Sequence, residues 1–111
     1  MENLFFQFKD HEIDAIDLYT ALIRDGYSEE DAIACVALSI LVTDRRFVHL
    51  YDIYPNIDDL YKNEPGIVAQ ALYSQSHVLA DQYRDLYMKN FGHDIPLISS
   101  RAFDALMNED D

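Results

Sequence analysis

The sequence predicts an all-α fold: a compact bundle of four to five helices with a buried central helix and one long helix in the C-terminal half. Only three glycines and three prolines occur, and most of them separate segments of helical length. Apolar residues within those segments recur at helical spacing. The chain has 111 residues, half of them apolar, which suits a single domain over residues 1–111 with a substantial core.

The N-terminal part is expected to contain an apolar segment and then a helix. Residues 4–8 are too apolar to stay loose, so they should fold back onto the body of the protein, with a short strand as one alternative. Residues 11–25 predict the first helix, which Gly26 would end. Its apolar positions fall near one face: Ile13, Ile16, Leu22 and Ile23.

The second helix has the clearest start in the chain. Ser28 precedes three acidic residues, and this order forms a capping box in front of an apolar run. The run over residues 32–42 is apolar on all sides, so this helix should be central and the most buried. Its β-branched residues also permit a strand, but the capping box and the alanines favour a helix.

The rest of the sequence predicts three helices, and one segment before them is ambiguous. Residues 44–54 either end the central helix or continue it to just before Pro55. Asn56 would cap a short helix over residues 57–62. Pro65 would open the longest helix, residues 65–91, which Gly92 would end. A last short helix would follow a cap at Ser99 or Ser100.

The strong acidity excludes several classes of partner. There are 21 acidic residues against eight basic ones, a formal net charge of −13, and such a surface repels nucleic-acid phosphates and anionic lipid. Cys35 is the single cysteine, so no intrachain disulfide can form. The longest apolar stretch is too short to span a bilayer, and the N-terminus lacks the basic region of a signal peptide. We therefore expect a cytoplasmic protein that binds neither nucleic acid nor membrane directly.

A search for catalytic or metal-binding patterns finds none that is complete. His77 and Asp81 share a helix face, but two ligands do not make a metal site. His93-Asp94 lacks the additional histidine and aspartate of helical metal-dependent phosphohydrolases, and Cys35 has no basic neighbours in the sequence. There is also no phosphate-binding glycine loop and no nucleophile elbow, so the sequence predicts a protein that is not an enzyme and has neither cofactor nor metal.

The negative charge is concentrated in one part of the chain. Residues 10–31 hold eight acidic residues and one basic residue, a formal charge of −7. Most such stripes are solvated faces that keep a small protein soluble. The alternative is a surface that docks on a basic partner, with carboxylates spaced like nucleic-acid phosphates. Two groups would converge near Gly26 to form it: Asp10, Asp14, Asp17, Glu29, Glu30 and Asp31.

A second group of candidate residues combines tyrosine with acid around Pro55. Tyr51 and Tyr54 precede this proline and Tyr61 follows it, and the flanking acids are Asp52, Asp58 and Asp59. Tyrosine rings are rigid and amphipathic, and aromatic residues are common anchors in interfaces. The alternative is that the rings cover the boundary of a small core and keep their hydroxyls in water.

Three short segments resemble, in order, landmarks of the colicin-DNase immunity proteins: Ser28-Glu29-Glu30, Tyr51-Asp52-Ile53-Tyr54-Pro55 and Pro65-Gly66-Ile67-Val68. Those proteins are acidic four-helix inhibitors with a Tyr-Tyr-Pro sequence on their third helix. Here the tyrosine pair is split, and a long helix follows that the family lacks. The resemblance covers residues 28–68 and implies an acidic, tyrosine-containing inhibitory face.

The sequence therefore favours a non-enzymatic inhibitor that binds a protein partner with a basic, nucleic-acid-handling surface. A DNA-mimic anti-defence protein of a phage or mobile element, such as an anti-CRISPR or anti-restriction factor, fits this description. An antitoxin or immunity protein fits it as well. A different interpretation is a helical regulatory or structural subunit that forms a homodimer through residues 65–91. Apolar residues lie on more than one face of that segment: Ile67, Tyr73, Tyr87 and Met88.

Overall fold

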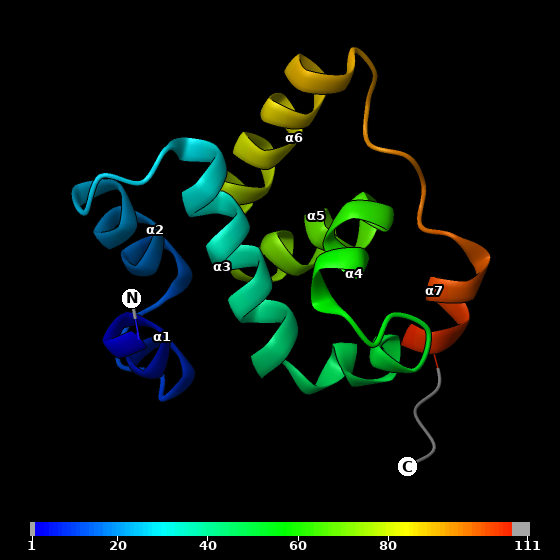
Figure 1. The fold of residues 1–111 in the computed structure, drawn as a ribbon, viewed down its shortest axis with the longest axis horizontal. Coiled ribbons are helices and arrows are strands. Elements are labelled where there is room, and N and C mark those ends of the chain that lie inside the picture. The colour runs from blue at the N-terminus through cyan, green and yellow to red at the C-terminus, as the bar shows by residue number, and fades with distance from the viewer. Residues whose placement is uncertain (1, 108–111) are drawn as a thin grey trace.

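The computed structural model describes residues 2–107, and every regular element in that range is a helix, which confirms the all-α prediction (Figure 1). Residues 2–107 form eight helical segments in place of the four to five expected. In chain order they are α1 (Glu2–Lys9), α2 (Ala15–Arg24), α3 (Glu29–Thr43), the 3-10 helix η1 (Arg45–Asp52), α4 (Ile57–Asn63), α5 (Pro65–Gln75), α6 (His77–Phe91) and α7 (Ser100–Leu106).

Helix α3 is the centre of the fold, as predicted. Figure 1 shows α1 and α2 on one side of it and α4, α5 and α6 on the other. The Ser28 hydroxyl accepts a hydrogen bond from the Asp31 amide at 3.1 Å, so the expected N-cap is present. The buried residues of α3 occur around its circumference, because helices pack on both of its sides: Ala32, Ile33, Val36, Ala37, Ser39, Ile40 and Leu41.

The N-terminal segment folds back onto the body, but as the helix α1 and not as a strand. Phe8 is buried in the common core, and α1 packs against α2 and α3. A helix satisfies its backbone hydrogen bonds within one segment, whereas a lone strand needs a neighbouring strand as partner. The described part of the chain offers no such strand.

The first predicted helix begins four residues later than expected. The backbone turns at residues 10–14, where His11 has a φ of 63°, and α2 starts only at Ala15. Asp14 is the N-cap of α2, so Asp10 does not share a helix face with Asp14 and Asp17, and that prediction was wrong. The predicted apolar face was also shifted, because α2 buries Ala15, Leu18 and Leu22 while Ile16 and Ile23 are exposed.

The long helix expected over residues 65–91 is two helices, α5 and α6, which pack against each other. Ser76 breaks it by adopting an extended backbone conformation, with φ −162° and ψ 120°. The Ser76 hydroxyl then accepts a hydrogen bond from the Leu79 amide at 3.3 Å and caps α6. The apolar pattern continues through the break because both helices face the same core.

The ambiguous segment after α3 is the 3-10 helix η1, with Asp44 as its N-cap. The other predicted boundaries are confirmed. Asn56 caps α4, Pro65 is in the first turn of α5, Gly92 ends α6 with a φ of 76°, and Ser99 caps α7.

One buried carboxylate joins three separate parts of the chain. Glu64, between α4 and α5, is 3% exposed and accepts hydrogen bonds on the same oxygen, Oε2, from the hydroxyls of Tyr54 at 2.6 Å and Ser99 at 2.7 Å. The connector from α6 to α7 passes close to this point, because a Cβ added at Gly66 would lie 3.0 Å from the Pro96 carbonyl oxygen. We call this set of contacts between Tyr54, Glu64 and Ser99 the Glu64 junction. It fixes α7 and its connector to the body.

Candidate functional site

The predicted acidic surface is divided between the two ends of α2. Asp14 and Asp17 form a capping box at its start, where the Asp14 carboxylate accepts from the Asp17 amide at 2.8 Å and the Asp17 carboxylate accepts from the Asp14 amide at 3.4 Å. The ten residues of α2 then cover ~15 Å before the turn at Gly26. These two acids thus stabilise a helix start and lie apart from the acids of α3.

The acids of α3 form the second group. Glu29, Glu30 and Asp31 occupy the first turn of α3 and are all exposed. The positive end of the helix dipole stabilises carboxylates in this position. The Glu30 carboxylate accepts a hydrogen bond from the side-chain amide of Asn90 at 3.0 Å, which links the start of α3 to the last turn of α6.

A cleft of about 430 Å³ opens directly beside these acids, between α3, α4, the start of α5, and α6. We call it the aromatic cleft. Its base consists of the buried residues Ile33, Pro65 and Tyr83, and its exposed residues are Glu30, Lys62, Asn90 and Phe91. The remaining lining residues are half-buried: Tyr61, Leu86 and Tyr87.

Four rings form a continuous series along the aromatic cleft. The ring centroids of Tyr61 and Tyr83 are 6.3 Å apart with an edge-to-face arrangement, those of Tyr83 and Tyr87 are 6.3 Å apart, and those of Tyr87 and Phe91 are 4.5 Å apart. Aromatic rings at these separations attract one another, which holds the rings in place. The cleft therefore has four packed aromatic rings in its lining, on a preformed scaffold.

The phenols of Tyr61 and Tyr83 in the aromatic cleft stay protonated at neutral pH. Burial raises the pKa of Tyr83 far above its ordinary value, and the neighbouring phenols of Tyr61 and Tyr87 raise it further. Burial also raises the pKa of Tyr61, followed by the negative charges of Glu30 and, more weakly, Asp31. The field of the α3 acids thus reaches into the cleft.

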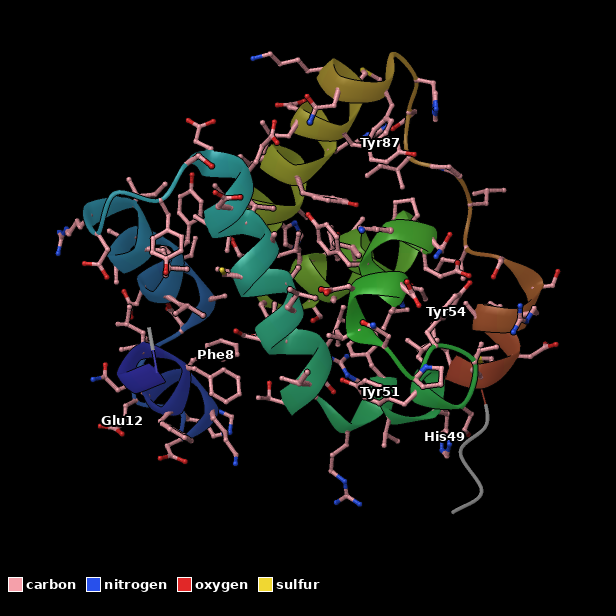
Figure 2. The ribbon with its side chains drawn as sticks, viewed as in Figure 1. Phe8, Glu12, His49, Tyr51, Tyr54 and Tyr87 are labelled. Carbon is pink, nitrogen blue, oxygen red and sulfur yellow. The ribbon has the colours of Figure 1, made fainter. Side chains whose placement is uncertain are left out.

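In Figure 2, Tyr51 lies near the C-terminal end of α3 and Tyr54 lies beside α4 and α7, and both are apart from Tyr87 of the aromatic cleft. Tyr51 donates its hydroxyl to the Leu41 carbonyl oxygen at 3.2 Å, near the end of α3, and Tyr54 donates to Glu64. Both rings are half-buried, so their hydroxyls serve internal contacts. Asp58 and Asp59 are exposed in the first turn of α4, where they complement its dipole.

The histidines and the cysteine bring no additional chemistry together. His77 stacks on Tyr73 with centroids 4.1 Å apart, and Asp94 of the His93-Asp94 pair binds Arg84, which lowers the pKa of that carboxyl. Burial and the charge of Asp31 raise the pKa of Cys35, which disfavours a reactive thiolate. Within residues 2–107, no three metal-ligating side chains gather, and no helix is long and apolar enough to cross a membrane.

Of the ten candidate residues predicted from sequence, only Glu30 lines the aromatic cleft. The rings of α6 were missed, although their spacing could have revealed them, since Tyr83, Tyr87 and Phe91 recur every four residues and so share one helix face. Tyr61, which the sequence grouped with the tyrosines around Pro55, and Lys62 join them only through the packing of α4 against α5.

Comparison with known protein families, with curated proteins and with solved structures finds no match to this chain. The similarity to colicin-DNase immunity proteins therefore stays a resemblance between short segments.

Proposed function

We propose that this chain is a non-enzymatic inhibitor that binds the basic, nucleic-acid-handling surface of a protein partner. The observation that carries the proposal is the exposed acidic first turn of α3 beside the aromatic cleft. A carboxylate cluster supplies attraction to a basic surface and fast association, while aromatic side chains supply contact area for a stable complex. The formal net charge of −13 keeps the whole molecule from competing for nucleic acid itself.

The setting that fits this proposal is an anti-defence protein of a phage or mobile element that acts in the cytoplasm. Restriction enzymes and RNA-guided nucleases hold nucleic acid in positively charged channels, and an acidic protein in such a channel excludes the substrate. An antitoxin or immunity protein would use the same chemistry on a toxic nuclease. Both are inhibitors of one class, and they differ in the identity of the partner.

The experiment combines capture and inhibition. The protein is used as bait in a host lysate at low and high salt, and each captured nuclease is purified and assayed for cleavage with and without the protein. We expect inhibition that weakens as salt rises, because surface charge attraction is screened. If no captured enzyme is inhibited at a stoichiometric concentration of the protein, the proposal is wrong.

Two charge-reversal variants test which acids matter. Glu29→Lys with Glu30→Lys reverses the α3 acids and should weaken inhibition about tenfold or more. Glu12→Lys with Asp104→Lys makes the same change in net charge at exposed positions elsewhere and should leave inhibition unchanged. If both variants lose inhibition to the same extent, total charge, and not this surface, determines binding. Asp14 and Asp17 are unsuitable for this test because their capping box stabilises α2.

Self-association is the alternative function. Tyr73, Val78, Met88 and Phe91 are exposed apolar side chains on α5 and α6, although Ile67, which was expected to contribute, is buried. A homodimer through these helices would double the mass measured by light scattering at micromolar concentration. A monomeric mass there would exclude this function and leave the inhibitor proposal in place.

A further inference from the structure

The aromatic cleft combines two properties that call for an occupant of defined chemistry. Its volume of about 430 Å³ is within the range of small-ligand sites, and most of its lining is ring and aliphatic carbon. Its opening carries the carboxylate of Glu30, and the charge of Glu30 is felt at the Tyr61 hydroxyl inside. An apolar ligand would satisfy the first property, and an anion would be repelled by the second.

A guanidinium group satisfies both properties. It is planar and weakly hydrated, so it stacks on aromatic faces, and it forms paired hydrogen bonds with a carboxylate. The Glu30 carboxylate is already oriented by Asn90, which donates to Oε1, and an ionised carboxylate accepts several further hydrogen bonds. Tyr87 and Phe91 lie 4.5 Å apart at the exposed end of the series, and Figure 2 shows Tyr87 at the far end of α6.

The arrangement of Lys62 is consistent with such an occupant. Its ammonium group is exposed on α4, and the causes that raise the pKa of Tyr61 are burial and negative neighbours, led by Glu30. Among the charged side chains, Glu30 therefore acts most strongly on this phenol. A second cation is attracted to that negative charge and can stack on the aromatic rings of the cleft.

We propose that the aromatic cleft binds an arginine side chain of the basic partner protein, with its guanidinium between Glu30 and the rings of the half-buried Tyr87 and the exposed Phe91. This inference rests on the proposed function for the identity of the partner, but the arginine site itself can be tested without that partner. A lysine ammonium fits less well, because it is strongly hydrated and cannot stack as a plane.

The test uses three small probes and the full chain. N-acetylarginine methylamide, the lysine analogue and the norleucine analogue are titrated into isotopically labelled protein, and chemical shifts are followed by NMR. We expect saturable shifts of Tyr61, Tyr87 and Phe91 with the arginine probe, and binding at least roughly threefold weaker with lysine and norleucine. Equal binding of norleucine would show an apolar pocket and overturn the proposal.

Matched variants localise the effect. Phe91→Ala and Glu30→Gln should each weaken arginine binding roughly three- to thirtyfold, the range that one stacking or charge contact supplies. Phe103→Ala and Glu12→Gln make the same chemical changes at exposed positions on α7 and in the α1–α2 turn, and they should bind as the unmodified chain does. Undiminished binding by Phe91→Ala, or shifts spread over all acidic residues, would overturn the site.

The two proposals fail in different ways. If the arginine probe binds the aromatic cleft but no nuclease is inhibited, the inhibitor function is wrong and the site stands. If a nuclease is inhibited equally by Phe91→Ala and by the unmodified chain, the function stands and the arginine anchor is wrong.

Discussion

Tyr54→Phe is the most informative test of how the fold is held together. It removes one hydroxyl that donates to Glu64 Oε2 at 2.6 Å and leaves the ring in place. A hydrogen bond to a charged group contributes about 1.5–3 kcal/mol to the free energy of unfolding. We expect a loss of that size, which corresponds to a decrease in Tm of roughly 6–12 °C for a domain of this length.

Tyr51→Phe is the matched control. Its hydroxyl donates to a neutral acceptor, the Leu41 carbonyl oxygen, at a longer distance of 3.2 Å. A neutral hydrogen bond of this kind contributes about 0.5–1.5 kcal/mol, so this variant should lose less stability.

Urea unfolding followed by circular dichroism measures the free energy of unfolding of both variants. The m-value should stay constant, since neither change alters the surface exposed on unfolding. If Tyr54→Phe costs no more than Tyr51→Phe, the Glu64 junction is not an important source of stability. A Ser99→Ala, Tyr54→Phe double-mutant cycle would then show whether the two hydroxyls that share Oε2 are coupled at all.

Three further predictions concern caps, core and pH. Asp14→Ala should lower the free energy of unfolding by about 0.5–2 kcal/mol in urea titrations, and Asp10→Ala should not, because only Asp14 caps α2. Ile40→Ala should cost about 2–5 kcal/mol, whereas Val78→Ala, at 66% exposure, should change the free energy of unfolding by less than about 0.5 kcal/mol in the same assay. Thermal stability should fall steadily above pH 10, the ordinary pKa of tyrosine. The reason is that a raised folded-state pKa stabilises the fold only while the phenol stays protonated, and four phenols have a raised pKa: Tyr51, Tyr54, Tyr61 and Tyr83. A Tm that stays constant between pH 10 and 12 would contradict this prediction.

Helix boundaries that depend on local chemistry could be predicted from the sequence. Ser28, Asn56, Pro65 and Ser99 each begin a helix where expected, because a cap involves only the residue itself and the next turn. The break at Ser76 was missed since apolar spacing continues across it. Only the packing of α5 against α6 requires the chain to turn there.

The aromatic cleft lay beyond what the sequence could reveal. The spacing of Tyr83, Tyr87 and Phe91 predicts a shared face, but a shared aromatic face is also typical of a core. The cleft arises because α3, α4 and α6 meet without filling the space between them. For the acidic residues the fold has the opposite effect. The sequence predicted that Asp14 and Asp17 would converge with Glu30 near Gly26, but α2 separates them.

The Glu64 junction also has a consequence for the order in which the protein folds. Its hydrogen-bond donors lie ten residues before it and 35 residues after it, so the contact with Ser99 closes a long loop. Closing that loop costs chain entropy. The hydrogen bond between Ser99 and Glu64 compensates this cost only after α4 and α5 have buried Glu64. We therefore expect α7 to dock last during folding and to detach first during native-state fluctuations, with its backbone amides exchanging with solvent deuterium sooner than those of α3.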